Sequence, residues 1–274
     1  MPDGRPERFR MNGGHPLAQG LVAAYLGELP RSTYVHDSSL RCNHGTCTGM
    51  SFPPTATSGP VWNSYLRRWV WALDGINDYI FLPSVVPSPP FTLTAWVKRT
   101  NHSAYMAILG STWIDASHWG SDWGLDKVAP YGHYLAQNQT ALIGSSTSGV
   151  ADSTWLPLSL SYDGTNWKTY QKGVLDGSGS VTKTLTTTIN TIGCSGGVGG
   201  ALREYFNGSI ADLFIHNRVL TPAEIALCAD PVRSIDYDGL ILPPRRRVFA
   251  ATAAGPSFKA AWARRQQQFI GGAI

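Results

Sequence analysis

Apolar and polar residues alternate in short runs along most of the chain, and this two-residue period is the pattern of half-buried β-strands. The clearest run covers residues 91–98, where alternate apolar positions should share one strand face: Phe91, Leu93, Ala95 and Val97. We expect that face to lie in the core. Apolar runs at residues 20–26 and 205–215 predict a first and a last buried strand.

Two pairs of such runs are separated by turn sequences. Residues 69–82 contain two runs on either side of Asp74-Gly75, and residues 155–171 contain two on either side of Asp163-Gly164. Because an Asp-Gly pair favours the tight turn between antiparallel strands, we predict a hairpin at each place.

One short helix is predicted at residues 221–227. Thr221 can cap its N-terminus, Pro222 suits the first helical position, and Glu224 completes a capping box. The chain therefore ends its strand-rich part with a single helix.

Composition supports many short strands. Hydrophobic residues make up 43% of the 274 residues and charged residues 15%, and the 29 glycines and 18 prolines supply turns. A chain of this length can bury a large core. We predict an all-β domain at residues 15–230, an N-terminal arm at residues 1–14 and a tail at residues 231–274.

Neither a secretory signal nor a membrane span is evident in the sequence. The first residues are polar, and no run of about 18 apolar residues occurs. We therefore expect synthesis in a cytoplasm, where the four cysteines would be free thiols; the alternative is that Cys42 and Cys47 close a small disulfide loop.

Several stretches together resemble the laminin-G-like, concanavalin A-like jelly rolls. They are Gly20–Tyr25, Asp37-Ser38, Asn43–Thr46, Leu73–Ile80, Phe91–Val97, Phe206–Asp212 and Asn217–Ile225. This resemblance covers about residues 15–230. It implies a jelly-roll β-sandwich with one short C-terminal helix and extended N- and C-terminal arms.

The flanks resemble laminin-G-bearing proteins encoded among tailed-phage structural genes. The matching strings are His15–Leu21 and a tail that holds Pro243–Arg247 and Trp262–Gly272. This resemblance implies a virion protein made in a host cytoplasm.

The tail combines basic and apolar side chains. It holds seven Lys or Arg residues against two Asp, a net charge of +5, in a segment too short and too rich in Pro and Gly to form its own core. We expect it to lie against a partner surface or to exchange between subunits, although a basic tail can also meet nucleic acid or water. The residues expected to carry assembly are Arg245, Arg246, Arg247, Trp262, Arg264, Arg265 and Phe269.

Motifs for catalysis are missing. A glycosidase needs two carboxyl groups roughly 5–10 Å apart, and the four glutamates, Glu7, Glu28, Glu204 and Glu224, form no E-x-D-x-x-E pattern. The sequence also contains no G-x-S-x-G or P-loop motif. We expect no enzymatic activity.

A tryptophan-rich stretch at residues 113–124 is a candidate glycan site. Aromatic faces could stack on sugar rings while Asp and His bond hydroxyl groups, so the candidate residues are Trp113, Asp115, His118, Trp119 and Trp123. The alternative is that these tryptophans belong to the core or to an interface.

No cofactor is required by these patterns. Related jelly rolls often hold a structural calcium ion, so the resemblance implies Asp37, Asn43 and Asp212 as possible ligands. Asp37 and Asn43 could instead stabilise turns through bonds to the backbone.

The first functional hypothesis is a non-catalytic virion structural protein for decoration, stabilisation or host-surface attachment. Its partners would be capsid or tail subunits, copies of itself and cell-surface glycans, with neither membrane insertion nor nucleic acid expected. The alternative is a soluble carbohydrate-binding or adhesion module. An enzyme would need acids from distant strands, such as Asp122, Asp126 and Asp163.

The assembly role of the tail can be tested by truncation. We expect the full chain to oligomerise and a chain ending at Asp230 to stay monomeric in size-exclusion chromatography with light scattering. Two clean monomers would contradict an assembly role.

Overall fold

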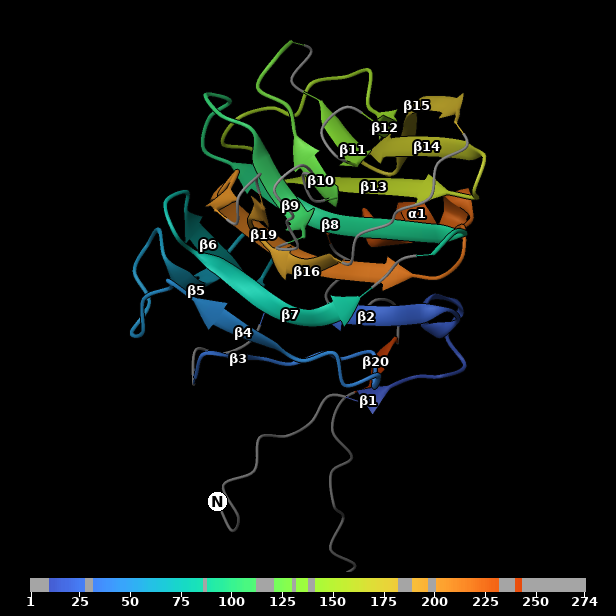
Figure 1. Cartoon of the computed structure of the whole chain (residues 1–274). Coiled ribbons are helices and arrows are strands. Elements are labelled where there is room, and N and C mark those ends of the chain that lie inside the picture. The colour runs from blue at the N-terminus through green and yellow to red at the C-terminus, as the bar shows by residue number, and fades with distance from the viewer. Residues whose placement is uncertain are drawn as a thin grey trace, which may run out of the picture. The chain divides into compact units, whose positions relative to one another are not determined.

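The computed structural model describes residues 10–27, 32–85, 88–111, 121–129, 132–137, 141–181, 189–196, 201–231 and 240–242. Within these ranges the chain forms two eight-stranded sheets, and every strand pair is antiparallel. Figure 1 shows the strands of both sheets stacked across the body.

The sheet here called the front sheet carries the strands on which the candidate site lies. In spatial order they are β12 (Ala141–Ser145), β11 (His133–Gln137), β10 (Ser121–Leu125), β9 (Met106–Gly110), β16 (Ile189–Ile192), β7 (Tyr79–Val85), β4 (Gly45–Thr48) and β3 (Tyr34–Val35).

The back sheet is built around β19, which pairs on one edge with β8 and on the other with both β6 and β2. Its strands are β15 (Val174–Ser180), β14 (Asn166–Gln171), β13 (Leu156–Tyr162), β8 (Phe91–Arg99), β19 (Asn207–His216), β6 (Arg68–Asp74), β5 (Gly59–Asn63) and β2 (Leu21–Tyr25). The predicted all-β sandwich with one short C-terminal helix is confirmed.

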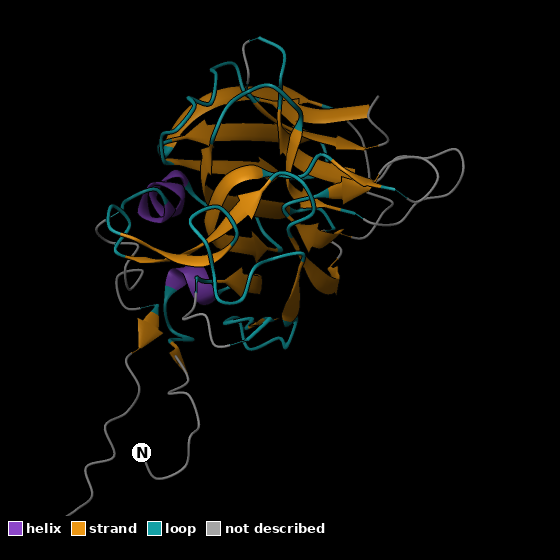
Figure 2. Cartoon of the chain, turned by 90° about the vertical axis from the view of Figure 1, so that its left-hand side faces the viewer, coloured by secondary structure: helices purple, strands orange, loops and turns teal. Residues whose placement is uncertain are grey.

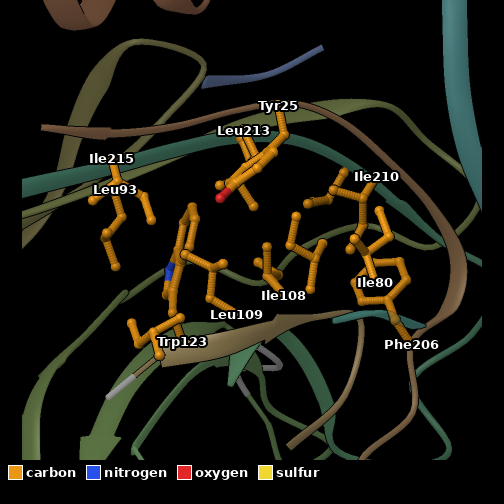
Figure 3. Packing of buried hydrophobic residues seen from close by; sticks show 14 of the residues in the cluster. Tyr25, Ile80, Leu93, Ile108, Leu109, Trp123, Phe206, Ile210, Leu213 and Ile215 are labelled. Atoms are coloured by element: carbon orange, nitrogen blue, oxygen red, sulfur yellow. The ribbon is translucent and has the colours of Figure 1, made fainter. Parts of the chain in front are cut away.

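The core lies between the two sheets. The four residues predicted to share a face of β8, Phe91, Leu93, Ala95 and Val97, all lie in it, as expected for the two-residue period. Figure 3 shows Leu93, Leu213 and Ile215 of the back sheet facing Trp123 and Leu109 of the front sheet.

A second apolar cluster covers the outer face of the back sheet. It joins helix α1 (Pro222–Cys228) and the 3-10 turn η1 (Pro16–Ala18) to β2, β14 and β19. Figure 2 shows both helical segments on the same side of the body. The predicted capping box of α1 is present, because Thr221 Oγ1 accepts from the Glu224 amide and Glu224 Oε2 accepts from the Thr221 amide.

Strand β19 changes partner midway along its length. Residues 207–210 pair with β6 and residues 213–216 pair with β2. Between them Asp212 has a φ of 48° and forms an ion pair with Arg68. This break in the ladder lets one strand serve two neighbours.

Of the two predicted hairpins, one is confirmed and one is wrong. Strands β13 and β14 pair across the Asp163 turn. The turn at Asp74, by contrast, carries the chain from β6 in the back sheet to β7 in the front sheet. Leu73 therefore reaches the core from the back sheet and Ile80 from the front sheet, whereas a hairpin would place both strands in one sheet.

Part of the predicted arm and tail belongs to the folded body. β1 (Arg10–Met11) pairs with β20 (Ile241–Leu242), and the Asn12 amide donates to the Leu240 carbonyl at 2.7 Å. Leu240 is buried in the cluster that holds α1. Residues 243–274, and with them all seven predicted assembly residues, lie outside the described residues.

The four cysteines form no disulfide. A small hairpin of β17 (Ser195–Gly196) and β18 (Leu202–Arg203) precedes β19. No helix among the described residues has the length and apolar character needed to cross a bilayer.

Two buried histidines should make folding stability depend on pH. Burial is the main cause that lowers the pKa of His133 and of His216 from 6.5 to about 4. The stabilisation that comes from keeping these imidazoles neutral is therefore complete above pH 6.5. As the pH falls towards 4, the free energy of unfolding decreases by on the order of 3 kcal/mol for each histidine. Asp122, whose pKa is raised, acts in the opposite sense, so the effect must be measured as a difference between variants.

The comparison uses His133→Asn, since an Asn oxygen can still accept the hydrogen bond that Trp123 Nε1 donates to His133 Nδ1. Urea unfolding at pH 7, 5.5 and 4.5 should show the parent losing stability relative to this variant as the pH falls. Parallel curves would contradict the assignment.

Candidate functional site

Core packing directs a set of polar and aromatic side chains to the outer face of the front sheet. Five of them each stand next to a buried core residue in the chain, and for the three that lie on strands, Tyr79, Asp122 and Tyr134, alternation turns the side chain away from the core. These pairs are Tyr79 with Ile80, Tyr105 with Met106, Asp122 with Trp123, Tyr134 with Leu135, and Tyr205 with Phe206.

These five residues and Glu204 are called the front-face cluster. Two of its ring pairs are in contact: the ring centroids of Tyr79 and Tyr205 are 6.5 Å apart, and those of Tyr105 and Tyr134 are 6.4 Å apart in an edge-to-face arrangement. All four tyrosines are partly exposed. They offer ring surface together with hydroxyl groups.

A glycine makes room for one of these rings. Gly124 pairs with Tyr134 on one side and with Ala107 on the other. A Cβ at Gly124 would lie 2.9 Å from the Tyr134 hydroxyl oxygen, which is closer than real contacts of this kind. The small residues on β9 and β10 thus let the Tyr134 ring lie across the sheet.

Two carboxyl groups meet beside these rings. Asp122 is only 3% exposed, and its side chain hydrogen-bonds with those of Tyr134 and Glu204. Burial, followed by the charge of Glu204, raises the pKa of Asp122 well above its ordinary value. Asp122 Oδ2 makes no hydrogen bond to any residue that the structure describes.

The charges of the pair act on the neighbouring tyrosines. Burial and then the charges of Asp122 and Glu204 raise the pKa of Tyr134, and burial, Asp126 and Glu204 raise that of Tyr105. The Lys127 ammonium nitrogen lies 5.0 Å from the centre of the Tyr105 ring. Both hydroxyls therefore stay protonated at neutral pH and can act as donors.

Of the predicted glycan-binding residues, one is described and does not fit. Trp123 is fully buried in the core and donates to His133, so the interpretation as a sugar-stacking ring is wrong and the core alternative holds. Trp113, Asp115, His118 and Trp119 lie outside the described residues.

The predicted calcium ligands already have partners in the protein. The Asp37 carboxylate accepts hydrogen bonds from the amides of Ala24, Ser39 and Asn43 and from the Ser39 hydroxyl, at 2.8–3.0 Å. The Asn43 side chain donates to the Val22 carbonyl at 2.9 Å. The turn-stabilising alternative therefore accounts for both residues.

Asp212 does not join them, because its carboxylate pairs with the Arg68 guanidinium, which would repel a cation. Within the described ranges no three or more His, Cys, Asp or Glu side chains are grouped to hold a metal ion.

Local sequence patterns do not reveal the front-face cluster. Sequence patterns associate Asp122 only with a possible acid pair from distant strands, and they leave Glu204 outside any motif. The sequence contains only a weak indication of this cluster: in each strand, the side chain next to a predicted core residue points outward. Which outward side chains meet depends on strand order, and the sequence does not state that order.

Comparison with known families identifies the chain. Residues 74–226, more than half of the chain, match the Concanavalin A-like lectin/glucanases superfamily, in its laminin G branch. The chain belongs to this family, which confirms that part of the predicted resemblance. No curated protein gave a significant match to the sequence.

Solved structures share the fold at low identity. Domain 4 of AbnA, a GH43 extracellular arabinanase from Geobacillus stearothermophilus solved with arabinotriose, superposes with a TM-score of 0.60 at 20% identity. The match covers 77% of this chain and 98% of that one.

Two further matches are longer proteins. The binding domain of Paraclostridial Mosquitocidal Protein 1 gives a TM-score of 0.52 at 14% identity, over 79% of this chain and 53% of that one. A Trypanosoma rangeli sialidase in complex with sialic acid gives a TM-score of 0.54 at 13% identity, and the match covers 81% of this chain and 33% of the sialidase chain. The chain thus spans only a third of the sialidase. None of these findings supports the phage resemblance of the flanks.

The role of Asp37 can be tested against calcium binding. Asp37→Ala should lower the free energy of unfolding by about 3 kcal/mol, because several buried donors lose their acceptor. Addition of EDTA to the parent should leave the Tm unchanged. A Tm that falls with EDTA and recovers with calcium would contradict this view.

Proposed function

We propose that the chain is a non-catalytic carbohydrate-binding domain and that a saccharide binds along the front-face cluster. The observation that carries this proposal is that two contacting pairs of partly exposed tyrosines lie at the front sheet and that one of them, Tyr105 with Tyr134, stands beside two carboxyl groups. Tyrosine rings can pack on the apolar faces of sugar rings, and carboxylates accept hydrogen bonds from sugar hydroxyls.

The proposal is supported by the kind of protein that shares the fold. One such structure is an arabinanase domain solved with arabinotriose, and another is the binding domain of a toxin. At 20% identity or less these matches concern the fold alone, so sugar binding by this chain rests on its own side chains.

The geometry of the two acids supports a binding role over hydrolysis. A glycosidase keeps its two carboxyl groups roughly 5–10 Å apart so that a sugar, and in some enzymes a water, fits between them. Asp122 and Glu204 share a hydrogen bond, which leaves no such space. Asp163, the other acid considered, sits in the exposed β13–β14 turn and accepts hydrogen bonds from the Thr165 and Asn166 amides.

Loss of the rings should weaken sugar binding. We expect Tyr79→Ala and Tyr205→Ala each to reduce the affinity about tenfold, since each removes stacking worth about 1–2 kcal/mol. A glycan array would identify the saccharide, and titration calorimetry would measure the affinity. Tyr205→Phe, which keeps the ring, should bind within a few-fold of the parent.

The matched control is Trp62→Ala. Trp62 is 56% exposed but lies on β5, at the edge of the back sheet, so its loss should leave the affinity unchanged. Equal losses in Trp62→Ala and the two alanine variants, or no binding to any saccharide, would contradict the proposed function.

A further inference from the structure

Phe81 is a large apolar side chain on the outer face of the front sheet. It lies on β7 between Ile80 and Leu82, which are both fully buried, so alternation turns its ring outward, where it is 47% exposed. It follows Tyr79 by two residues and therefore shares a strand face with it. The Phe81 ring is not part of the core cluster, so it is available to pack against a ligand.

The neighbours of Phe81 continue this face towards the edge of the sheet. Thr46 on β4 lies opposite Phe81, and Tyr34 on β3 lies opposite Thr46. Directly opposed residues of an antiparallel pair lie on the same face, and all three are exposed. Thr48, which lies opposite Tyr79, is exposed as well. The outer face therefore carries aromatic rings and hydroxyl groups beyond Tyr79.

The two tyrosine pairs are linked through the backbone at the end of β9. The Ala107 amide donates to the Glu204 carbonyl at 2.8 Å, which places the segment that leads to Tyr205 beside β9. Ala107 lies opposite Gly124 on β10, and Gly124 lies opposite Tyr134 on β11. The two ring pairs, one with Tyr205 and one with Tyr134, thus lie along one line that crosses the strands.

The length of this line follows from the order of the strands. Four strand spacings separate β11 from β7, because β10, β9 and β16 lie between them. At about 4.8 Å for each spacing, the line from Tyr134 to Phe81 is about 19 Å long. A line of this length is several times as long as one sugar ring. It carries aromatic rings at intervals, as a linear saccharide carries apolar ring faces at intervals.

We propose that Phe81 forms a further subsite of the sugar site and that this site binds a linear saccharide chain along several of its units. This inference rests on the proposed function. The two tyrosine pairs and Phe81 pack on different sugar rings of one chain, and Thr46 offers a hydroxyl group to the sugar at Phe81. Because each occupied subsite adds favourable contacts, the affinity should rise with the length of the chain.

The first measurement is the dependence of affinity on chain length. A glycan array identifies the saccharide, and size-fractionated oligomers of it, from the monosaccharide upwards, are then titrated by calorimetry into the full chain. We expect the Kd to be at least about tenfold lower for oligomers that can reach from Tyr134 to Phe81 than for the disaccharide. Still longer oligomers should bring no further gain.

Substitutions at Phe81 assign the outer subsite. Phe81→Thr removes the ring and keeps a side chain that suits a strand. We expect it to weaken binding of the long oligomers about five- to tenfold, and binding of the disaccharide less than about twofold, because a disaccharide can bind at the tyrosine pairs. Phe81→Tyr keeps the ring and should retain the length dependence.

The matched control is Leu175→Thr. Leu175 is 52% exposed but lies on β15 of the back sheet, so its loss should change the affinity for neither the long nor the short oligomer. Thermal unfolding of each variant checks that it is folded, and light scattering measures its oligomeric state.

Each outcome has a definite meaning. If the affinity does not depend on chain length, or if Phe81→Thr keeps the full length dependence while Tyr79→Ala loses binding, the inference is wrong and the proposed function stands. If Phe81→Thr leaves binding unchanged but dissociates a dimer, Phe81 belongs to a contact between copies of the chain and the inference is again wrong. If no saccharide binds, or binding survives the loss of Tyr79 and Tyr205, both the proposed site and this inference are wrong.

Discussion

The packing of two sheets over one core is the constraint on which the candidate site depends. A strand with one buried face must turn every second side chain to the opposite side. Trp123, Ile80 and Leu135 fill the core from β10, β7 and β11, and each therefore fixes an outward neighbour. The front-face cluster is oriented largely by the hydrophobic free energy gained when these core residues are buried on the opposite side of the sheet.

Two features of the site oppose stability, and the surrounding fold compensates for them. Asp122 brings a carboxyl group into a buried position, where its charged form is disfavoured, and Glu204 adopts a backbone conformation that a residue with a Cβ seldom takes. Neither is needed to complete the core. Strain and buried acids of this kind concentrate at functional sites, which is why these two residues, and not the many exposed polar groups, direct the functional argument.

Local patterns predicted much of the fold. The alternation at residues 91–98 identified the core face of β8, and the Thr221 to Glu224 pattern identified the capped helix, because both depend on neighbours in the chain. The hairpin predicted at Asp74 is wrong because a tight turn can join strands of one sheet or of two sheets. Packing of the two strands against the core determines which of these forms. The predicted tail includes Leu240, but this residue packs with Leu17 and Ile225, a contact between distant parts of the chain that local patterns do not encode.

The site was harder to predict for the same reason. Its six residues come from β7, β10, β11 and the segments before β9 and β19, and they meet only because β10, β9, β16 and β7 lie in that order. A cluster of tryptophans close in sequence drew attention instead. The one of them that the structure describes, Trp123, turns inward because large aromatic rings also fill cores.

The most direct test of a saccharide on the front sheet is the mapping of backbone amide shifts in the isotope-labelled full chain during titration with an array-identified glycan. The account predicts that the shifts concentrate around Tyr79, Tyr105, Asp122, Tyr134 and Glu204. Shifts concentrated on β5, β14 or β15 of the back sheet, or no shifts with any glycan, would contradict it.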